Sequence, residues 1–339
     1  MYKVKIITGK NSDGLLKQTA NGEGISSCGK YQFFIDEEIK APDFLVVRNK
    51  YIKSKIKIKV APENTILALS EPYSIVNFPK KYRDQFGLVC SCQEEITHSN
   101  IFYTPAILPW LVGVVKKNNL TIHSRSYDDL KRSSFPRKTK LLSVITSNKA
   151  FTKGHQERIN FVRRLKEYFG DQIDVFGRGF NDFEDKWDVL APYKYHIALE
   201  NSSSNYYWTE KLSDCFLAGT YPIYYGCKNL EDYFPSEAYT SIDIHDFEKS
   251  IQKIKEIISA DYTTLDINPL EKSKELVLEN YNMFNLIAKY CDTLNGDLPK
   301  QDITLKPSFT LIDSHNFHLY FIERNILKLK SLFNRNNQI

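Results

Sequence analysis

The regular alternation of short apolar runs with longer amphipathic segments between residues 141 and 290 most constrains the fold of this chain. Strands alternating with helices require a parallel sheet with right-handed crossovers, so we predict a Rossmann-like second half, although it lacks a Gly-x-Gly-x-x-Gly fingerprint. The predicted strands cover 141–146, 173–176, 195–199, 221–225 and a short run at Ile242 and Ile244. The predicted helices cover 156–169, 210–217, 247–258 and 268–290.

The first half has a different texture, with short apolar or alternating runs and few helical stripes between them. The runs predict strands at 4–8, 44–48, 52–60, 65–69 and 87–91, which indicates an α/β fold here too. The basic, turn-rich segment 126–140 is a predicted domain boundary. With 339 residues available, we expect an N-terminal domain at 1–135, a C-terminal domain at 136–298 and an extension at 299–339.

Charge and hydropathy exclude some classes of protein. Forty-six Lys and Arg against 41 Asp and Glu leave a formal charge of +5, too small to predict a nucleic-acid partner, while a small phosphate-bearing ligand stays possible. The first residues predict a strand and lack the apolar core of a signal peptide. The most apolar stretch, 107–115, is far shorter than the roughly 20 residues that span a bilayer. We therefore expect a cytoplasmic location.

Polar and charged residues are densest between residues 193 and 212. A predicted strand ends at Glu200 and Asn201, and after a polar loop a predicted helix begins with Thr209, Glu210 and Lys211. A Lys in the first turn opposes the helix macrodipole and costs about 0.3–1 kcal/mol unless an anion lies there. Lys211 therefore indicates a phosphate site. The alternative is a helix capped by Thr209 with a merely solvated Lys211.

Three runs in this region resemble the signature of the α-1,3/4-fucosyltransferases, glycosyltransferase family 10. They are Leu-Glu-Asn-Ser at 199–202, Tyr-Trp-Thr-Glu-Lys-Leu at 207–212 and Ala-Gly-Thr-Tyr-Pro-Ile-Tyr-Tyr-Gly at 218–226. The resemblance covers roughly 141–294. It implies a GT-B fold, in which two Rossmann-like domains face each other across a cleft. It also implies GDP-β-L-fucose as the donor on the C-terminal domain, an acceptor on the N-terminal domain and inversion at the transferred carbon.

The resemblance also implies a set of donor-binding residues. Ser147-Asn148 followed by Arg158-Ile159-Asn160-Phe161 matches the family segment that supplies a phosphate-binding Arg, which would be Arg158. The alternative for Arg158 is an ordinary charge on the solvent face of a helix. By the same matching, the residues that would contact GDP or the fucose ring are Asn201, Tyr207, Glu210 and Lys211, with Ser147, Lys194 and Glu200 as neighbours.

Inversion by direct displacement needs a base that takes the proton from the acceptor hydroxyl. Family members carry that Glu beside a Pro, and Glu71 precedes Pro72 after the predicted strand 65–69. The order here is Ser-Glu-Pro, whereas Glu-Ser-Pro is commoner in the family. Glu94 and Glu95 are the rival bases, and the other alternative is that Glu71 only stabilises a turn.

No metal ion or other cofactor is expected to be required, and a divalent cation would at most stimulate the reaction. The chain has no Asp-x-Asp motif of the kind that holds Mn²⁺ in other nucleotide-sugar enzymes, and basic side chains can replace such an ion. His196 lies within a predicted strand and is expected to be packed or hydrogen-bonded rather than bound to a metal.

The segment 321–335 predicts a basic amphipathic helix, because Ile322, Ile326, Leu329 and Phe333 recur every three or four residues with basic residues beside them. Such a helix can lie on an anionic membrane surface or pack back across the two domains. Bacterial members of the family often end in such tails. This favours a peripheral enzyme on the inner face of the cytoplasmic membrane that acts on lipid-linked glycans of lipopolysaccharide or O-antigen type.

The sequence therefore predicts an inverting, metal-independent fucosyltransferase that uses GDP-fucose and a glycan acceptor, such as an N-acetylglucosamine-containing or O-antigen unit. Two alternatives stay open. One is a transferase of the same fold that uses another nucleotide sugar, and the other is a nucleotide- or glycan-binding protein without catalytic activity.

Overall fold

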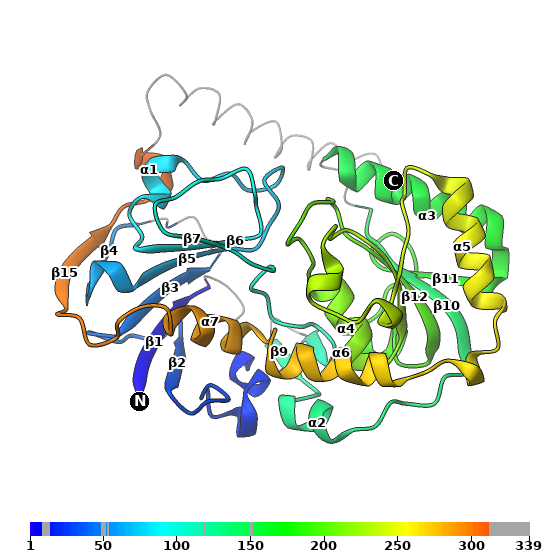
Figure 1. Cartoon of the computed structure of the whole chain (residues 1–339), viewed down its shortest axis with the longest axis horizontal. Helices are drawn as coiled ribbons and strands as arrows, with labels where there is room; N and C mark the ends of the chain where they lie inside the picture. The colour runs from blue at the N-terminus through cyan, green and yellow to red at the C-terminus, as the bar shows by residue number, and fades with distance from the viewer. Residues whose placement is uncertain (9–13, 49–51, 53, 118–119, 149–151, 312–339) are drawn as a thin grey trace.

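The protein consists of two parallel β-sheets, each in its own domain, placed side by side (Figure 1). The computed structural model describes residues 1–8, 14–48, 52, 54–117, 120–148 and 152–311. The two-domain α/β architecture that the sequence predicts, with two Rossmann-like units of GT-B type, is confirmed.

The N-terminal sheet has the strand order β2-β1-β3-β5-β6-β7, and all of its pairings are parallel. Its central strands β3 and β5 are continuous apolar runs because both of their faces are buried. The predicted strands that join this sheet are confirmed, while β2 and β7 at its two edges were not predicted. The bounds are β1 Tyr2–Ile7, β2 Tyr31–Ile35, β3 Phe44–Arg48, β5 Thr65–Leu69, β6 Leu88–Ser91 and β7 Ile101–Tyr103.

Little helix covers this first sheet, as its sequence predicts. One face packs against α1 (Lys80–Arg83) and against an antiparallel pair formed by β4 (Ile56–Val60) and β15 (Gln301–Leu305). β4 is the part of the predicted strand 52–60 that pairs. Between the two domains lie the β8–β9 hairpin, with strands Val114–Lys117 and Leu120–His123, and α2 (Tyr127–Arg132).

The C-terminal sheet has the order β11-β10-β12-β13-β14 and is also entirely parallel. Four of its strands lie where the sequence predicts them, within two residues at each end. The fifth, β14, covers Thr240–Ser241, so the prediction of a strand at Ile242 and Ile244 was wrong, although both side chains are buried. The remaining bounds are β10 Lys140–Ile145, β11 Ile173–Phe176, β12 Tyr193–Leu199 and β13 Tyr221–Tyr225.

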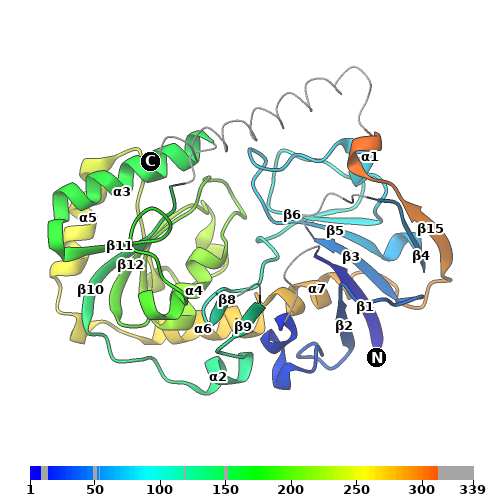
Figure 2. The same cartoon turned by 180° about the vertical axis from the view of Figure 1, so that it is seen from behind.

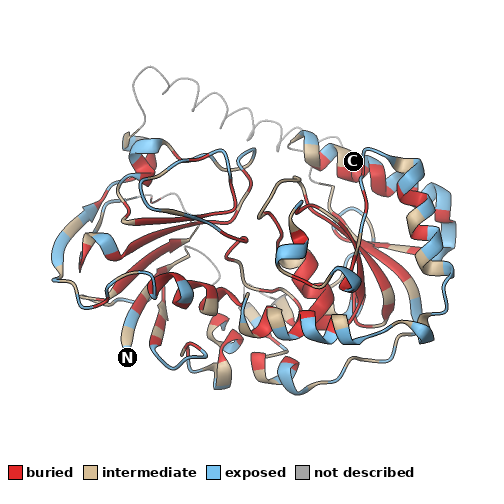
Figure 3. Cartoon of the chain, viewed as in Figure 1, coloured by how far each residue is buried: buried red, intermediate tan, exposed pale blue. Residues whose placement is uncertain are grey.

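Helices cover both faces of this second sheet. Helices α3 (Lys153–Phe169) and α5 (Phe247–Ser259) lie on one face, where the Phe161 and Phe247 rings meet edge to face. Helices α4 (Glu210–Ala218) and α6 (Asn268–Glu279) lie on the other face (Figures 1 and 2). The buried side chains of β10, β11, β12 and β13 and of these helices form one core (Figure 3).

The predicted helix 268–290 is two helices, α6 and α7 (Met283–Cys291), which lie along the same side of both domains (Figure 1). Asn282 separates them: its Oδ1 accepts a hydrogen bond from the amide of Phe284 at 2.8 Å, and its Nδ2 donates to the carbonyl of Gln18 at 2.6 Å. Apolar side chains of α7 then pack on the N-terminal sheet, against Val4 and Ile6 among others.

This packing moves the predicted domain boundaries. Residues 283–291, assigned above to the C-terminal domain, and residues 301–305, assigned to the extension, both belong to the N-terminal domain. The physical reason is that an apolar helical stripe can bury itself on either sheet, and the sequence does not say on which.

Replacing Asn282 by Ala should lower the free energy of unfolding by about 0.5–2 kcal/mol, because the α7 cap and the bond to Gln18 are both lost. Urea unfolding measures this loss. The control is Asn280→Ala, at the carboxyl end of α6, which should change stability by less than half as much. Equal losses in the two variants would contradict this role for Asn282.

The predicted amphipathic helix at 321–335 lies outside the described residues. Among the residues that are described, no helix is long and apolar enough to cross a membrane.

Candidate functional site

The site lies at the carboxyl edge of the C-terminal sheet, between β10 and β12. The chain leaves β10 toward β11 on one side and returns to β12 on the other, so the strand order reverses here. At such a switch point the loops after the two strands diverge, and ligands bind between them. Gly154 lets α3 come close to the loop after β12, because a Cβ at Gly154 would lie 2.1 Å from the carbonyl oxygen of Asn201.

Glu200, Thr209 and Lys211 form a buried polar cluster at the start of α4. The carboxylate of Glu200, which is 0% exposed, accepts hydrogen bonds from the amide of Thr209 at 2.9 Å and from its hydroxyl at 2.7 Å. Its other oxygen lies 2.9 Å from Nζ of Lys211, whose side chain is only 26% exposed. Thr209 caps α4 as predicted, whereas the idea of a merely solvated Lys211 is wrong: Glu200 is the anion that offsets the macrodipole.

Glu210 and Asp214 face a second buried lysine, Lys186. Nζ of Lys186 lies 2.8 Å from Asp214 and 3.7 Å from Glu210, and Lys211 also lies 3.7 Å from Glu210. Burial alone would raise the pKa of Glu210, but Lys211 and Lys186 outweigh it and lower that pKa to about 2. Glu210 is therefore ionised at neutral pH and can accept hydrogen bonds from a ligand such as a ribose hydroxyl.

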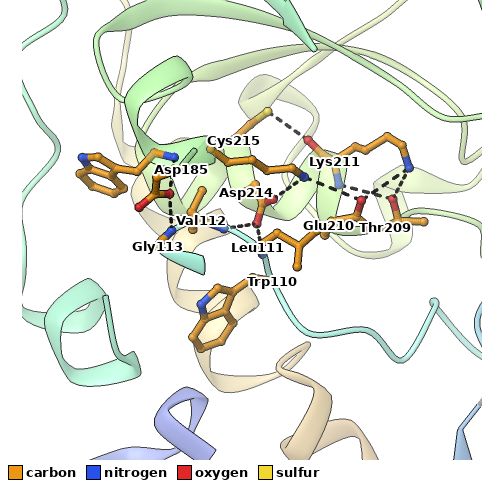
Figure 4. Close-up of polar contacts among 12 residues, drawn as sticks. Trp110, Leu111, Val112, Gly113, Asp185, Thr209, Glu210, Lys211, Asp214 and Cys215 are labelled. Atoms are coloured by element: carbon orange, nitrogen blue, oxygen red, sulfur yellow. Dashed lines mark hydrogen bonds and ion pairs between the residues drawn. The ribbon is translucent and has the colours of Figure 1, made fainter. Parts of the chain in front are cut away.

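Asp214 also ties α4 to the segment that joins the two domains (Figure 4). Its Oδ1 accepts hydrogen bonds from the amides of Leu111 at 2.8 Å and Val112 at 3.2 Å. The neighbouring amide of Gly113 donates to Asp185 at 2.8 Å. Sequence reasoning missed Lys186 and Asp214; a carboxylate on the apolar face of a predicted helix was the available signal.

Arg158 lies in α3 and is buried, with 6% of its surface exposed. Burial lowers its pKa, while Glu200 acts in the opposite direction. Arg158 makes no hydrogen bond or ion pair with any residue that the structure describes, and its Nε is buried without a partner. The alternative of an ordinary surface charge is therefore wrong. A buried guanidinium that has no carboxylate beside it among these residues is suited to binding an anionic ligand.

Arg158 and the first residues of α4 line a cavity of about 330 Å³. Its walls come from the ends of β10 and β11, from α3 and from α4. The polar residues in them include Ser147, Arg158, Arg178, Lys186, Glu210 and Lys211. The structure thus brings together four of the predicted donor-site residues around a cluster of cations, and we refer to this space as the cationic cavity.

Asn201 and Tyr207 lie at the domain interface, outside the cationic cavity. The hydroxyl of Tyr207 donates to Oδ1 of Asn201 at 2.7 Å, and the Tyr207 ring packs against Cys92 and Ala106 of the N-terminal domain. Asn201 lines a second cavity of about 690 Å³, to which Ser74 of the N-terminal domain also contributes. The predicted donor residues are therefore divided between two adjoining spaces.

Glu71 follows β5 and lies three residues before Ser74, which lines the second cavity. Burial lowers the pKa of Arg48 to about 10, and the carboxylates of Asp36 and Glu71 limit that fall. Burial also raises the pKa of Tyr207, and Glu200 and Glu71 add to this effect. Glu71 therefore lies within electrostatic reach of both Arg48 and the C-terminal domain, in a place where a base could meet a donor.

The rival bases lie in a more open setting. Glu94 and Glu95 are both exposed, and Glu94 accepts a hydrogen bond from Nδ2 of Asn205 across the domain interface at 3.0 Å. That bond gives Glu94 a role in joining the two domains, which makes it a useful control for Glu71.

Lys194 is not part of the site. It lies at the amino end of β12, where its Nζ is 5.5 Å from the centre of the Tyr262 ring, so its prediction as a donor-site neighbour was wrong. The predicted role of His196 holds: Nδ1 lies 2.8 Å from the hydroxyl of Ser143, and burial lowers its pKa to about 3. In the described part of the chain, no group of three or more His, Cys, Asp and Glu residues could hold a metal ion.

Part of the chain matches known proteins. Residues 135–264 match the family model "Glycosyltransferase family 10 (fucosyltransferase) C-term". Over 115 residues the chain is 36% identical to alpha-(1,3)-fucosyltransferase 4 of Bos taurus, covering 32% of this chain and 27% of that protein. Over 176 residues it is 26% identical to 4-galactosyl-N-acetylglucosaminide 3-alpha-L-fucosyltransferase 9 of Rattus norvegicus, covering 47% of each. The chain thus spans less than half the length of these curated relatives.

Among solved structures, the chain is similar to an alpha1,3-fucosyltransferase with GDP, at 16% identity and a TM-score of 0.48, over 84% of this chain and 92% of that one. The match to the family model contains every predicted donor-site residue and ends before α6, and Glu71 lies outside it. Residues 135–264, most of the C-terminal domain, therefore resemble the C-terminal part of glycosyltransferase family 10, the fucosyltransferases.

Proposed function

We propose that this protein transfers L-fucose from GDP-fucose to a hydroxyl group of an acceptor glycan, with inversion at the transferred carbon. The observation that carries the proposal is the buried guanidinium of Arg158, which pairs with no carboxylate among the described residues and lines the same cavity as Lys211, within the family-matched domain. A bound diphosphate would supply the anion that Arg158 lacks.

The chemistry of the site supports this role. As GDP leaves, negative charge grows on its β-phosphate, and fixed cations aimed at that position stabilise the transition state without reorganising. Arg158 supplies such a cation, and Lys211 and Lys186, which are paired with Glu200 and Asp214, line the same cavity. We propose that no metal ion is required and that a divalent cation at most stimulates the reaction.

Glu71 is the proposed general base. It lies on the opposite domain from the cationic cavity, where it could take the proton from the acceptor hydroxyl as the fucosyl carbon is attacked from the other face. Arg48 lies within electrostatic reach of Glu71.

The acceptor is proposed from the relatives. Their names describe 3-alpha-fucosylation and, in one case, galactosyl-N-acetylglucosaminide. We propose an α-1,3 linkage to an N-acetylglucosamine-containing or O-antigen glycan. Peripheral contact of the segment 321–335 with the inner face of the cytoplasmic membrane, for access to lipid-linked glycans, is a proposal from its sequence pattern alone.

Calorimetry with GDP, UDP and CMP, and with their sugars, tests the donor. Wild-type protein should bind GDP and GDP-fucose selectively, and GDP at 100 times its Kd should stabilise the fold by about 2.7 kcal/mol. The variant Arg158→Ala should bind GDP 10- to 100-fold more weakly, since charge-assisted hydrogen bonds contribute about 1.5–3 kcal/mol.

The matched control is Arg163→Ala, the same change on the exposed face of the same helix, which should leave GDP affinity unaltered. Selective binding of another nucleotide would favour a transferase of this fold with a different donor. Tight GDP binding without turnover, with any acceptor or with water, would favour the non-catalytic alternative.

A further inference from the structure

The larger of the two cavities contains chemistry that the donor does not use. At about 690 Å³ it has roughly twice the volume of the cationic cavity, at about 330 Å³. It lies at the carboxyl ends of β12, β13 and β14, with the start of α3 on one side and Ser74 of the N-terminal domain on another. Almost all of its walls therefore belong to the C-terminal domain.

Tyr225, at the end of β13, lines this cavity together with His245. Its hydroxyl lies 3.3 Å from Nε2 of His245, and the two rings meet edge to face with centroids 6.0 Å apart. Burial raises the pKa of Tyr225 to about 12, with smaller contributions from the carboxylates of Asp243 and Glu157, while a hydrogen bond with Ser203 lowers it. Hydrogen-bond donors and acceptors thus converge beside one aromatic ring.

Two lysines, Lys153 and Lys228, and two carboxylates, Glu157 and Asp243, line this cavity, so its formal charges balance in number. Lys153 pairs with Glu157 at 3.5 Å, and the carboxylate of Asp243 accepts a hydrogen bond from the amide of His245 at 3.0 Å. The cationic cavity differs, because Nε of its buried Arg158 has no partner among the residues that the structure describes. A neutral, hydroxyl-rich ligand fits the larger cavity better than a phosphate does.

Position connects this cavity to the reaction. Asn201, whose side chain bonds Tyr207, forms part of its wall, and Ser74 lies three residues after Glu71. A ligand in this space would therefore lie between Glu71, the proposed base, and Asn201, which belongs to the part of the predicted donor site outside the cationic cavity. The volume leaves room for more than one sugar ring.

We infer that this cavity binds a pyranose unit of the acceptor glycan, with the Tyr225 hydroxyl and His245 as its hydrogen-bonding groups. The inference rests on the proposed function and extends it, because acceptor binding was expected on the N-terminal domain. It makes Tyr225 and His245 determinants of acceptor choice that the C-terminal domain supplies.

The test uses the full chain saturated with GDP on an array of neutral and N-acetylated oligosaccharides, followed by calorimetry with the glycan that binds best. Tyr225→Phe removes one hydroxyl and keeps the ring, so the fold should survive. Its glycan affinity should fall about tenfold, as expected for one hydrogen bond. His245→Ala should weaken binding of the same glycan. The control Tyr168→Phe removes a tyrosine hydroxyl at an exposed position of α3 and should leave this binding unchanged.

The outcomes separate the possible sources of the sugar. If Tyr225→Phe lowers the affinity for GDP-fucose relative to that for GDP and leaves the glycan affinity unchanged, the cavity holds the donor's sugar and the inference is overturned. Unchanged glycan affinity in both pocket variants, or no glycan bound by the wild type, also overturns it while leaving the proposed donor intact. Failure of the wild type to bind GDP at all would overturn the proposed function instead.

Discussion

Glu71→Gln should lower the rate of fucose transfer by about 10²–10⁴-fold, the usual contribution of a general base. The amide keeps the shape of the side chain but cannot take the proton from the acceptor hydroxyl. Because Glu71 lies on the opposite domain from Arg158 and Lys211, the affinity for GDP should stay within about twofold of wild type. Initial rates at saturating donor, together with GDP calorimetry, measure the two quantities separately.

Glu94→Gln and Glu95→Gln are the matched controls for this experiment, since both carboxylates lie on the same domain and are exposed. Each should keep most of the wild-type rate. Transfer at near wild-type rate by Glu71→Gln, with a large loss in either control, would move the base to the loop that contains Glu94 and Glu95. A loss in GDP affinity equal to the loss in rate would mean that Glu71 shapes the donor site instead.

Lys211→Ala should destabilise the fold by about 3–5 kcal/mol, apart from any effect on the donor. The change leaves the carboxylate of Glu200, which is 0% exposed, without its counter-ion at 2.9 Å, and an uncompensated buried charge is costly. Urea unfolding without ligand measures this loss. Lys211→Ala is consequently a poor test of phosphate binding, for which Arg158→Ala is better suited.

The double variant Glu200→Gln with Lys211→Met should recover most of that loss, because it removes both charges and keeps an oxygen to accept the bonds from Thr209. The control is Lys272→Ala, which removes a partner of Glu275 at 2.8 Å on an exposed helix face and should cost less than about 1 kcal/mol. If Lys211→Ala cost no more than Lys272→Ala, the ion pair with Glu200 would contribute nothing to stability.

The sequence predicts those parts of the molecule in which local pattern and tertiary environment agree. Strand β12, the cap at Thr209 and helix α4 follow one another within 26 residues, so the motif and its local geometry could be predicted together. The pairing of Lys211 with Glu200 could not, because it depends on how the loop between them folds back.

Other parts depended on contacts between distant segments. Lys186 and Asp214 are 28 positions apart, and only the packed structure shows that they meet each other and the segment at Leu111. Lys194 shows a different limit. Proximity to Glu200 in the sequence suggested a shared site, but six residues of strand span about 20 Å, which takes Lys194 toward the opposite edge of the sheet.

The helical stripe from residue 268 to 290 passes through the break at Asn282 without any change in its period. Whether such a stripe stays on one sheet or crosses to another is decided by the partner surfaces, here the apolar face around Val4 and Ile6. The domain boundary therefore had to come from the structure.

Within the described residues, the chain passes between the domains twice, near Leu111 on the way out and at Asn282 on the way back. Asp214 holds the first crossing and the carbonyl of Gln18 holds the second. With the chain fixed at these two crossings, opening of the interdomain space would be a rotation about the line through them, and it would break the bond between Glu94 and Asn205. Glu71 and Arg158 lie on opposite domains and would separate and approach along one arc. The proposed base and the donor would then meet in the same geometry in each catalytic cycle.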